Sequence, residues 1–284
     1  MNAKFQNRLP PENINVSKTN PLLELIALFI GFLLVVAGVT LVLYLAGGVL
    51  ARQMPFAWED KLAALVFDQK KADATIDARS AALQKIADRL AQGLELPAGL
   101  HFTVRYVDDA TVNAFATLGG RIFVHKGLIN RLSSENALAM VIAHEMGHVL
   151  HRDPADALGG RLAIALVLNV FSSAIGTDAL ESMIGTTSNL TLLSFSREAE
   201  HQADALGIAL VARLYGHLGG AQQVFNELAA YEGKHALLAA PELLSTHPDS
   251  LRRAAFVTQE SERLGLSATG ALTELPAALR PDKE

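Results

Sequence analysis

The residues best suited to chemistry are two histidines and a glutamate in the stretch Val141-Ile-Ala-His-Glu-Met-Gly-His-Val-Leu150. A helix turns about 100° per residue, so His144 and His148 lie one turn apart on the same face and can bind one metal ion. Glu145 lies just round the helix, where it can act as a base on water that the metal activates. This HExxH spacing predicts a zinc site and a zinc endopeptidase.

The residues around this motif predict a buried helix. Leu138, Val141, Ile142, Val149 and Leu150 are apolar, and small residues between them allow close packing. Two histidines and a glutamate on such a helix would each cost desolvation energy, which metal coordination or hydrogen bonding must offset. The alternative is that they are core polar groups satisfied by hydrogen bonds alone.

A catalytic zinc site normally has three protein ligands, so a third must come from elsewhere in the chain. A metzincin would place a histidine ten residues after the first, but Pro154 stands there. The downstream carboxylates that could serve are Asp153, Asp156, Asp178, Glu181, Glu198, Glu200 and Asp204. Glu200 and Asp204 are the best of these because they share one helix face: one can bind zinc while the other accepts a hydrogen bond from a ligand imidazole.

Four motifs together resemble the CAAX prenyl protease and HtpX-like group of membrane zinc metallopeptidases, of the gluzincin type. In order they are Asn113-Ala-Phe-Ala with Gly119-Gly-Arg-Ile-Phe-Val124, His144-Glu-Met-Gly-His148, Ser196-Arg-Glu-Ala-Glu-His-Gln-Ala-Asp204, and Thr246-His-Pro248 followed by Arg253. The resemblance covers roughly residues 75–260 and implies a zincin-like domain. Members of this group have several transmembrane helices, whereas this sequence has one clear span, which puts prenylated substrates in doubt.

The resemblance also implies roles for individual residues. The zinc ligands would be His144, His148 and Glu200, which would hold one ion per chain. Glu145 would be the general base, and Asp204 would accept a hydrogen bond from a ligand imidazole. His247 would lie beside the metal, either as a fourth ligand that keeps the enzyme latent or as a donor to the oxyanion. Arg253 would stabilise charge on the substrate. The alternative for His247 is a surface histidine that caps a loop.

The fold predicted around this site is α+β and mainly helical, with a small sheet before the zinc helix. Residues 101–107 alternate, and residues 112–117 and 121–125 flank Leu118-Gly119-Gly120 as a hairpin. We expect Arg121 to His125 to be an exposed edge strand that pairs with extended substrate, the alternative being a core strand. The substrate-binding residues would be Asn113, Arg121, Ile122, Phe123 and Val124.

Periodicity predicts further helices over residues 75–92, 196–215, 220–232 and 248–264. The apolar stretch Leu162 to Phe171 is too short to span a bilayer. It predicts a buried helix packed on the zinc helix, or else a contact with the bilayer surface. Residues 176–194 are rich in Gly, Ser and Thr and favour a loop or lid.

Residues 22–51 are predicted to be a single transmembrane anchor, since Ile26 to Leu50 is an uncharged run of 25 residues. A cleaved signal peptide is the alternative, but its apolar region would be shorter. Basic residues are nearly balanced across the span, with a slight preference for the N-terminus inside. The catalytic domain, over 75–264, would then lie on the outer, periplasmic face of an inner membrane.

The remaining segments are predicted to be a flexible tail over 1–21, a linker over 52–74 and a loosely docked tail over 265–284. Phe56 and Trp58 in the linker would sit at the membrane interface or pack on the domain.

Composition excludes several classes of protein. The chain has no cysteine, so disulfides and cysteine-ligated zinc are ruled out. The net charge of −5 and the lack of a basic cluster argue against nucleic-acid binding. The expected partners are protein or peptide substrates, including misfolded envelope proteins, and the membrane. The second hypothesis is a membrane-anchored, chaperone-like binding factor whose zinc site is inactive or latent.

Overall fold

The computed structural model describes residues 20–66, 77–175, 195–235, 247 and 250–280. Residues 1–19 of the predicted tail, the predicted loop over 176–194, and Thr246 and Pro248 lie outside these ranges. The chain divides into two units, residues 1–42 and 43–284. The first unit contributes most of helix α1 (Pro21–Arg52), which, among the described helices, is the one long and apolar enough to cross a membrane.

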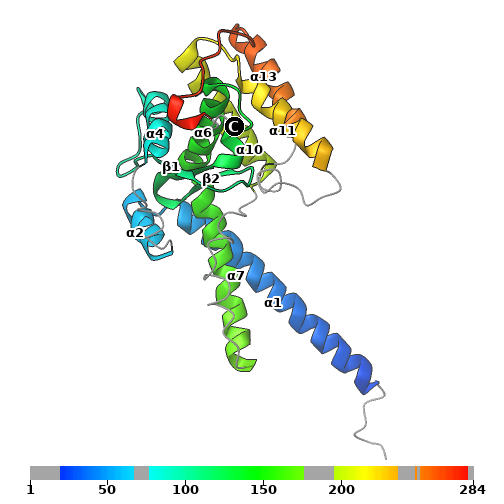
Figure 1. Cartoon of the computed structure of the whole chain (residues 1–284). Coiled ribbons are helices and arrows are strands. Elements are labelled where there is room, and N and C mark those ends of the chain that lie inside the picture. Colours follow the sequence, from blue (N-terminus) through cyan, green and yellow to red (C-terminus); the bar gives the residue numbers. More distant parts are fainter. Residues whose placement is uncertain (1–19, 67–76, 176–194, 236–246, 248–249, 281–284) are drawn as a thin grey trace, which may run out of the picture. The chain divides into compact units, whose positions relative to one another are not determined.

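The second unit is mainly helical with one small sheet, which confirms the predicted α+β fold (Figure 1). Its elements in chain order are α2 (Phe56–Val66), α4 (Ala78–Ala91), β1 (Thr103–Val107), β2 (Ala114–Thr117), η1 (Leu118–Gly120), β3 (Arg121–His125), α5 (Lys126–Ile129), α6 (Glu135–His151), α7 (Asp153–Ile175), α10 (Arg197–Tyr215), α11 (Ala221–His235), α13 (Ser250–Leu264) and η2 (Ala277–Leu279). The predicted helices are therefore present, with ends shifted by a few residues.

The sheet contains the predicted hairpin but has an unexpected strand order, β1-β3-β2. β2 pairs with β3 antiparallel, and β1 pairs with the other side of β3 in parallel. The prediction that Arg121 to His125 forms an edge strand is therefore wrong, because β3 is central. The edge strand nearest the zinc-motif helix α6 is β2.

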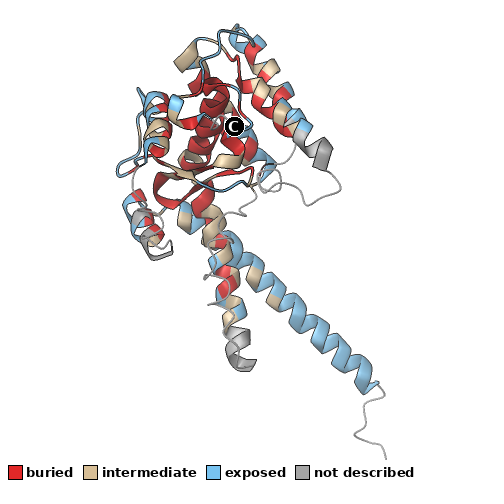
Figure 2. Ribbon diagram, in the orientation of Figure 1, coloured by how far each residue is buried: buried red, intermediate tan, exposed pale blue. Residues whose placement is uncertain are grey.

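Helix α6 forms the middle of the core, and every residue from Glu135 to Val149 is buried (Figure 2). Ser134 caps its start by accepting a hydrogen bond from the Ala137 N–H, at 3.2 Å. Helix α10 crosses α6 closely because glycines stand at the contact: a Cβ added at Gly147 would come within 2.8 Å of the Cα of Ala203. This close crossing brings the side chains of α10 to the HExxH face.

The predicted linker contains helix α2, which packs on the domain. Phe56 is buried, and the buried Glu59 carboxylate accepts a hydrogen bond from the Gly119 N–H at 2.9 Å. Glu59 also pairs with Arg152, the residue that ends α6, at 2.8 Å. Trp58 is exposed, so the two aromatic residues of this segment face different surroundings.

The C-terminal segment is firmly docked, unlike the loosely docked tail predicted for it. The Thr273 carbonyl accepts a hydrogen bond from the Glu135 N–H, and the Thr273 N–H donates one to Asn136 Oδ1, both at 2.8 Å. Leu275 and Leu279 are buried in the main core. This segment therefore holds the first turn of α6.

We expect Leu279→Ala to lower the free energy of unfolding by about 2–3 kcal/mol, because it leaves a cavity where a buried side chain stood. Chemical denaturation of the metal-loaded protein measures this loss. The matched control is Leu272→Ala in the same segment, where the side chain is 47% exposed. Equal stability of the two variants would contradict a docked segment.

Candidate active site

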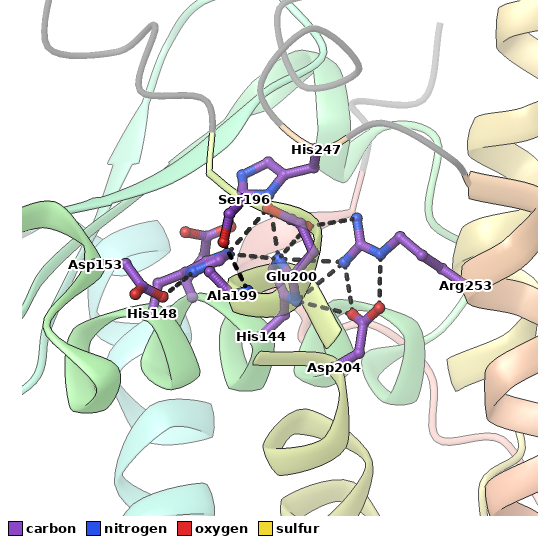
Figure 3. A network of polar contacts seen from close by, with 10 residues as sticks. His144, His148, Asp153, Ser196, Ala199, Glu200, Asp204, His247 and Arg253 are labelled. Carbon is purple, nitrogen blue, oxygen red and sulfur yellow. Dashed lines mark hydrogen bonds and ion pairs between the residues drawn. The ribbon is translucent and has the colours of Figure 1, made fainter. Parts of the chain in front are cut away.

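The structure brings four possible ligands together in one buried cluster (Figure 3). His144 and His148 come from α6, Glu200 from α10, and His247 from the segment before α13. One ligand atom of each lies within 4.8 Å of all the others. The Nε2 atoms of His144 and His148 are 3.0 Å apart, and His247 Nδ1 is 2.7 Å from Glu200 Oε1. Ligands around tetrahedral zinc, with bonds of roughly 2.0–2.1 Å, would be about 3.3 Å apart, so the cluster has the right size.

Two carboxylates orient the α6 histidines from behind. Asp153 lies 2.8 Å from the Nδ1 of His148, and Asp204 lies 2.9 Å from the Nδ1 of His144. Both imidazoles therefore direct Nε2 into the cluster, as metal-binding histidines usually do. Arg253 in turn holds Asp204 with two hydrogen bonds, of 2.9 Å from Nε and 2.7 Å from Nη2.

Glu145 lies beside this cluster and differs from its other carboxylates. Its side chain is 1% exposed, and within the described residues neither oxygen has a hydrogen-bond partner. The Nε2 atom of His247 lies 3.7 Å from Glu145 Oε1. A buried carboxylate without a hydrogen bond is costly, so this group is set up for a partner that a bound metal and its water would provide.

The charge balance of the cluster also fits a dication. Four buried carboxylates (Glu145, Asp153, Glu200 and Asp204) surround three histidines and one buried guanidinium, that of Arg253. The Oε2 atom of Glu200 is likewise buried without a hydrogen bond in the described part of the chain. A set of two histidines and one carboxylate, with a third histidine nearby, suits zinc.

The pKa values show how the cluster would take up a metal. Burial lowers the pKa of His144 to about 4, so this imidazole is neutral, as a ligand must be. Burial also acts to lower the pKa of His148, but hydrogen bonds that its ring donates to the Asp153 and Glu200 carboxylates outweigh burial and raise the pKa to about 9. Burial acts to raise the pKa of Asp204, yet Arg253 and His144 hold it well below its usual range. A metal would displace a proton from His148 and meet anionic carboxylates.

Comparison with known protein families shows where this cluster of histidines and carboxylates belongs. The family model described as peptidase family M48 matches residues 77–261. The chain belongs to peptidase family M48. This match confirms the resemblance to membrane zinc metallopeptidases and covers every residue of the cluster. M48 peptidases are metal-dependent, in agreement with the ligand set.

Curated relatives are similar over the same region. The chain is 33% identical over 162 residues to mitochondrial metalloendopeptidase OMA1 of Arabidopsis thaliana, covering 57% of this chain and 32% of that protein. It is 31% identical over 155 residues to the Schizosaccharomyces pombe protein of that name, covering 54% and 45%. It is 33% identical over 158 residues to a putative beta-barrel assembly-enhancing protease of Vibrio cholerae, covering 52% and 32%. The chain thus spans less than half the length of these relatives.

The predicted site residues fall into two groups. His144, Glu145, His148, Glu200 and Asp204 come together as expected, and His247 and Arg253 join them. His247 is 2% exposed, which removes the alternative of a surface histidine. The strand residues Arg121, Ile122, Phe123 and Val124 lie instead in the centre of the sheet.

Two contacts were not predicted from sequence. Asp153 was one of several candidate ligands, but its contact is with the Nδ1 of His148. Phe195, directly before the α10 motif, stacks on the His148 ring with 4.2 Å between ring centroids. The position of Asp153 five residues after His148, across a helix break, is a signal that could have found its role.

We expect Asp204→Asn to weaken zinc binding about 10–100-fold, because the amide no longer offers His144 Nδ1 a charged acceptor and breaks the pair with Arg253. Competition with a chromophoric chelator measures this affinity. Glu198→Gln, an exposed position on the same helix, is the matched control. Unchanged affinity in Asp204→Asn would show that this carboxylate does not support the ligand.

Proposed function

We propose that the protein is a membrane-anchored zinc endopeptidase that uses Glu145 as its general base. The observation that carries the proposal is the Glu145 carboxylate, buried without a hydrogen bond in the described residues, beside a metal-sized cluster. A structural metal site needs no such base. His144, His148 and Glu200 would hold one zinc ion per chain.

The chain's own groups then divide the work of peptide hydrolysis. When bound, zinc supplies a Lewis acid that polarises the scissile carbonyl and lowers the pKa of water. Glu145 accepts the proton of the attacking water and passes it to the leaving amine. Arg253 fixes Asp204, whose carboxylate lies against His144 Nδ1 and so leaves Nε2 as the nitrogen that would bind the metal. A direct contact of Arg253 with substrate charge stays a prediction.

The substrate-binding role moves from β3 to β2. The His125 N–H donates to the Asn113 carbonyl at 3.0 Å, which makes these two residues a hydrogen-bonded pair across the antiparallel strands. Because such pairs alternate, Phe115 and Thr117 also face β3, while the N–H and C=O groups of Ala114 and Ala116 point to the other edge. Ala114 and Ala116 are buried in this structure, so an extended peptide could pair with them, with little preference for sequence, only where this edge is uncovered.

We expect Ala116→Pro to lower kcat/KM for long peptides more than tenfold with a smaller loss of stability than Phe115→Pro causes, because this buried residue directs its N–H away from β3. Phe115→Pro is the matched control, since it removes an N–H that bonds β3 and should destabilise the sheet. Thermal unfolding and peptide cleavage are measured for both variants. Full activity in a folded Ala116→Pro variant would rule out pairing at this edge.

A small apolar pocket of about 20 Å³ lies beside the base. His144, Glu145, His247 and Arg253 line one side of it, and the apolar lining residues are Met140, Val141, Val224, Phe225 and Leu228. We propose that it receives an apolar substrate side chain next to the scissile bond.

The predicted anchor and the relatives support a proposal for the location and the biological role of the protein. We propose that α1 crosses an inner membrane with the N-terminus inside, so that the catalytic domain faces the periplasm. One relative is named for assembly of β-barrel proteins, which supports a role in quality control of envelope proteins. Substrates would then be misfolded or unassembled proteins near the membrane.

Casein cleavage by the purified full chain, with and without a chelator and with zinc restored, tests the proposal. Chelator-sensitive cleavage that zinc restores is the expected result. A metal-loaded protein that binds unfolded substrates without cutting them would favour the chaperone-like binding factor instead.

A further inference from the structure

Helix α7 presents apolar side chains outward from the catalytic unit. Leu162, Leu166 and Leu168 are 39%, 60% and 44% exposed, and no residue from Leu162 to Ile175 is charged. Figure 2 shows buried and exposed residues interleaved along this helix. Leu162 and Leu166 lie about 40° apart round the helix, but Leu168 lies about 160° from Leu166, so the exposed leucines point to more than one side. The prediction of a buried helix is therefore met only at residues between them, such as Ala163 and Ala165. A surface helix in water would carry polar residues at such exposed positions.

One side of α7 packs against the last turns of α1, residues 43–52, which belong to the same unit. The two helices are close enough that a Cβ added at Gly159 would collide with the carbonyl of Gly47. A Cβ at Gly160 would likewise collide with the ring of Tyr44. Glycines on both helices thus allow the close packing found between membrane helices.

The register of these contacts gives the direction of α7. Arg52 pairs with Asp156 at 2.8 Å, Gly47 lies against Gly159, and Tyr44 lies against Gly160. As residue numbers rise along α7 they fall along α1, so the helices are antiparallel. The apolar part of α7 therefore starts beside the end of the predicted anchor and runs toward the membrane side of it.

We propose that α7 enters the bilayer beside α1 and that Leu162, Leu166 and Leu168 contact lipid acyl chains. Lipid is the occupant that the geometry favours, because the exposed leucines lie on a helix that runs antiparallel to residues 43–52, the end of a helix long enough to span a membrane. The 14 residues from Leu162 to Ile175 extend about 21 Å as helix, less than the roughly 30 Å of a hydrocarbon core. Over its described length, helix α7 thus enters the membrane without crossing it. The pair of Arg52 and Asp156 marks the polar boundary.

This contact would fix the active site close to the membrane surface. Asp153, the first residue of α7, holds the ligand His148, and nine residues of helix, about 14 Å, separate it from Leu162. Resting on the proposed function, the substrate class becomes polypeptide segments that lie just outside the bilayer, such as the flanks of membrane-inserted proteins.

The absence of cysteine allows a direct test in the full chain. Leu166→Cys, labelled with an environment-sensitive nitrobenzoxadiazole dye, is reconstituted in phosphatidylethanolamine and phosphatidylglycerol vesicles that contain doxyl-labelled phosphatidylcholine. Val35→Cys in α1 is the lipid-exposed reference. Leu251→Cys on α13, where the side chain is 69% exposed, is the aqueous reference.

We expect the Leu166 label to emit at shorter wavelength and to be quenched by the doxyl lipid, as the Val35 label is. Emission and iodide quenching like those of the Leu251 label would overturn the proposal. A blue shift without doxyl quenching would also overturn it, since that result means burial against protein. None of these readouts depends on peptidase activity, so failure here is distinct from failure of the proposed function.

A second measurement tests the consequence for substrates. In the double variant Leu162→Asn with Leu166→Asn, cleavage of a lipid-anchored peptide should fall about tenfold. The reason is that the active site and the anchored peptide would no longer lie at the same distance from the membrane. Cleavage of the same peptide without its lipid should not change. An equal fall for both peptides would indicate general damage and would overturn this consequence.

Discussion

Glu145→Gln is expected to lower kcat for peptide hydrolysis by about 10²–10⁴-fold while the protein keeps its metal. The amide has nearly the shape of the carboxylate but cannot accept the proton of the attacking water. Glu145 directly follows His144 and precedes His148 by three residues. Neither of its carboxylate oxygens has a hydrogen-bond partner in the described residues. Its loss should therefore leave the ligand cluster intact.

The same variant should be at least as stable as the parent protein. A buried carboxylate without a hydrogen bond costs folding energy, and a neutral amide at that position costs less. Metal content, thermal unfolding and casein cleavage are measured together, with Glu198→Gln as the control. Retention of more than about a tenth of the parent activity would assign the base to another group. A loss of metal would show instead that Glu145 supports the ligands.

Helix α6, which contains the HExxH motif, is the part of the fold that the sequence predicts best. The HExxH spacing, the apolar residues and the small residues all lie within one stretch of chain. The periodicity of such a stretch is enough to predict a single helix. The pair Glu200 and Asp204 could be found for the same reason, since four residues apart means one face. Their meeting with α6 needs a close helix crossing, which Gly147 allows but does not by itself predict.

Strand order could not be predicted from the same kind of reasoning. Local pattern indicates that residues 112–125 form a hairpin, and they do. Whether β1 then adds beside β2 or beside β3 depends on contacts distant in sequence, and β1 adds to β3 in parallel. That choice makes β2, with the buried residues Ala114 and Ala116, the edge strand in place of Phe123 and its neighbours.

The segments around the core were misjudged because their composition resembles that of linkers and tails. Residues 52–66 and 265–280 have little periodicity, yet Glu59 and Thr273 each hold a buried backbone or capping group. Helix α7 shows the opposite case. Its apolar sequence predicts burial, and the structure leaves Leu162, Leu166 and Leu168 exposed.

His247 occupies a position that decides whether the site is open. Its Nδ1 lies 2.7 Å from Glu200 Oε1 and 3.3 Å from His144 Nε2, which places it among the ligand atoms. Its Nε2 also lies 3.7 Å from Glu145 Oε1, where the base would meet water. Of the two roles that the sequence left open, this geometry favours a fourth ligand that closes the site.

We therefore expect His247→Ala to raise basal cleavage and to weaken zinc binding at the same time. If the histidine closes the site about 90% of the time, its removal raises the competent fraction, and with it the rate, about tenfold. His201→Ala, an exposed histidine on α10, is the control. Casein cleavage and chelator competition are measured on both variants. A fall in kcat of about 10²-fold with unchanged zinc affinity would make His247 an oxyanion donor instead, because a donor acts on the transition state and not on the metal.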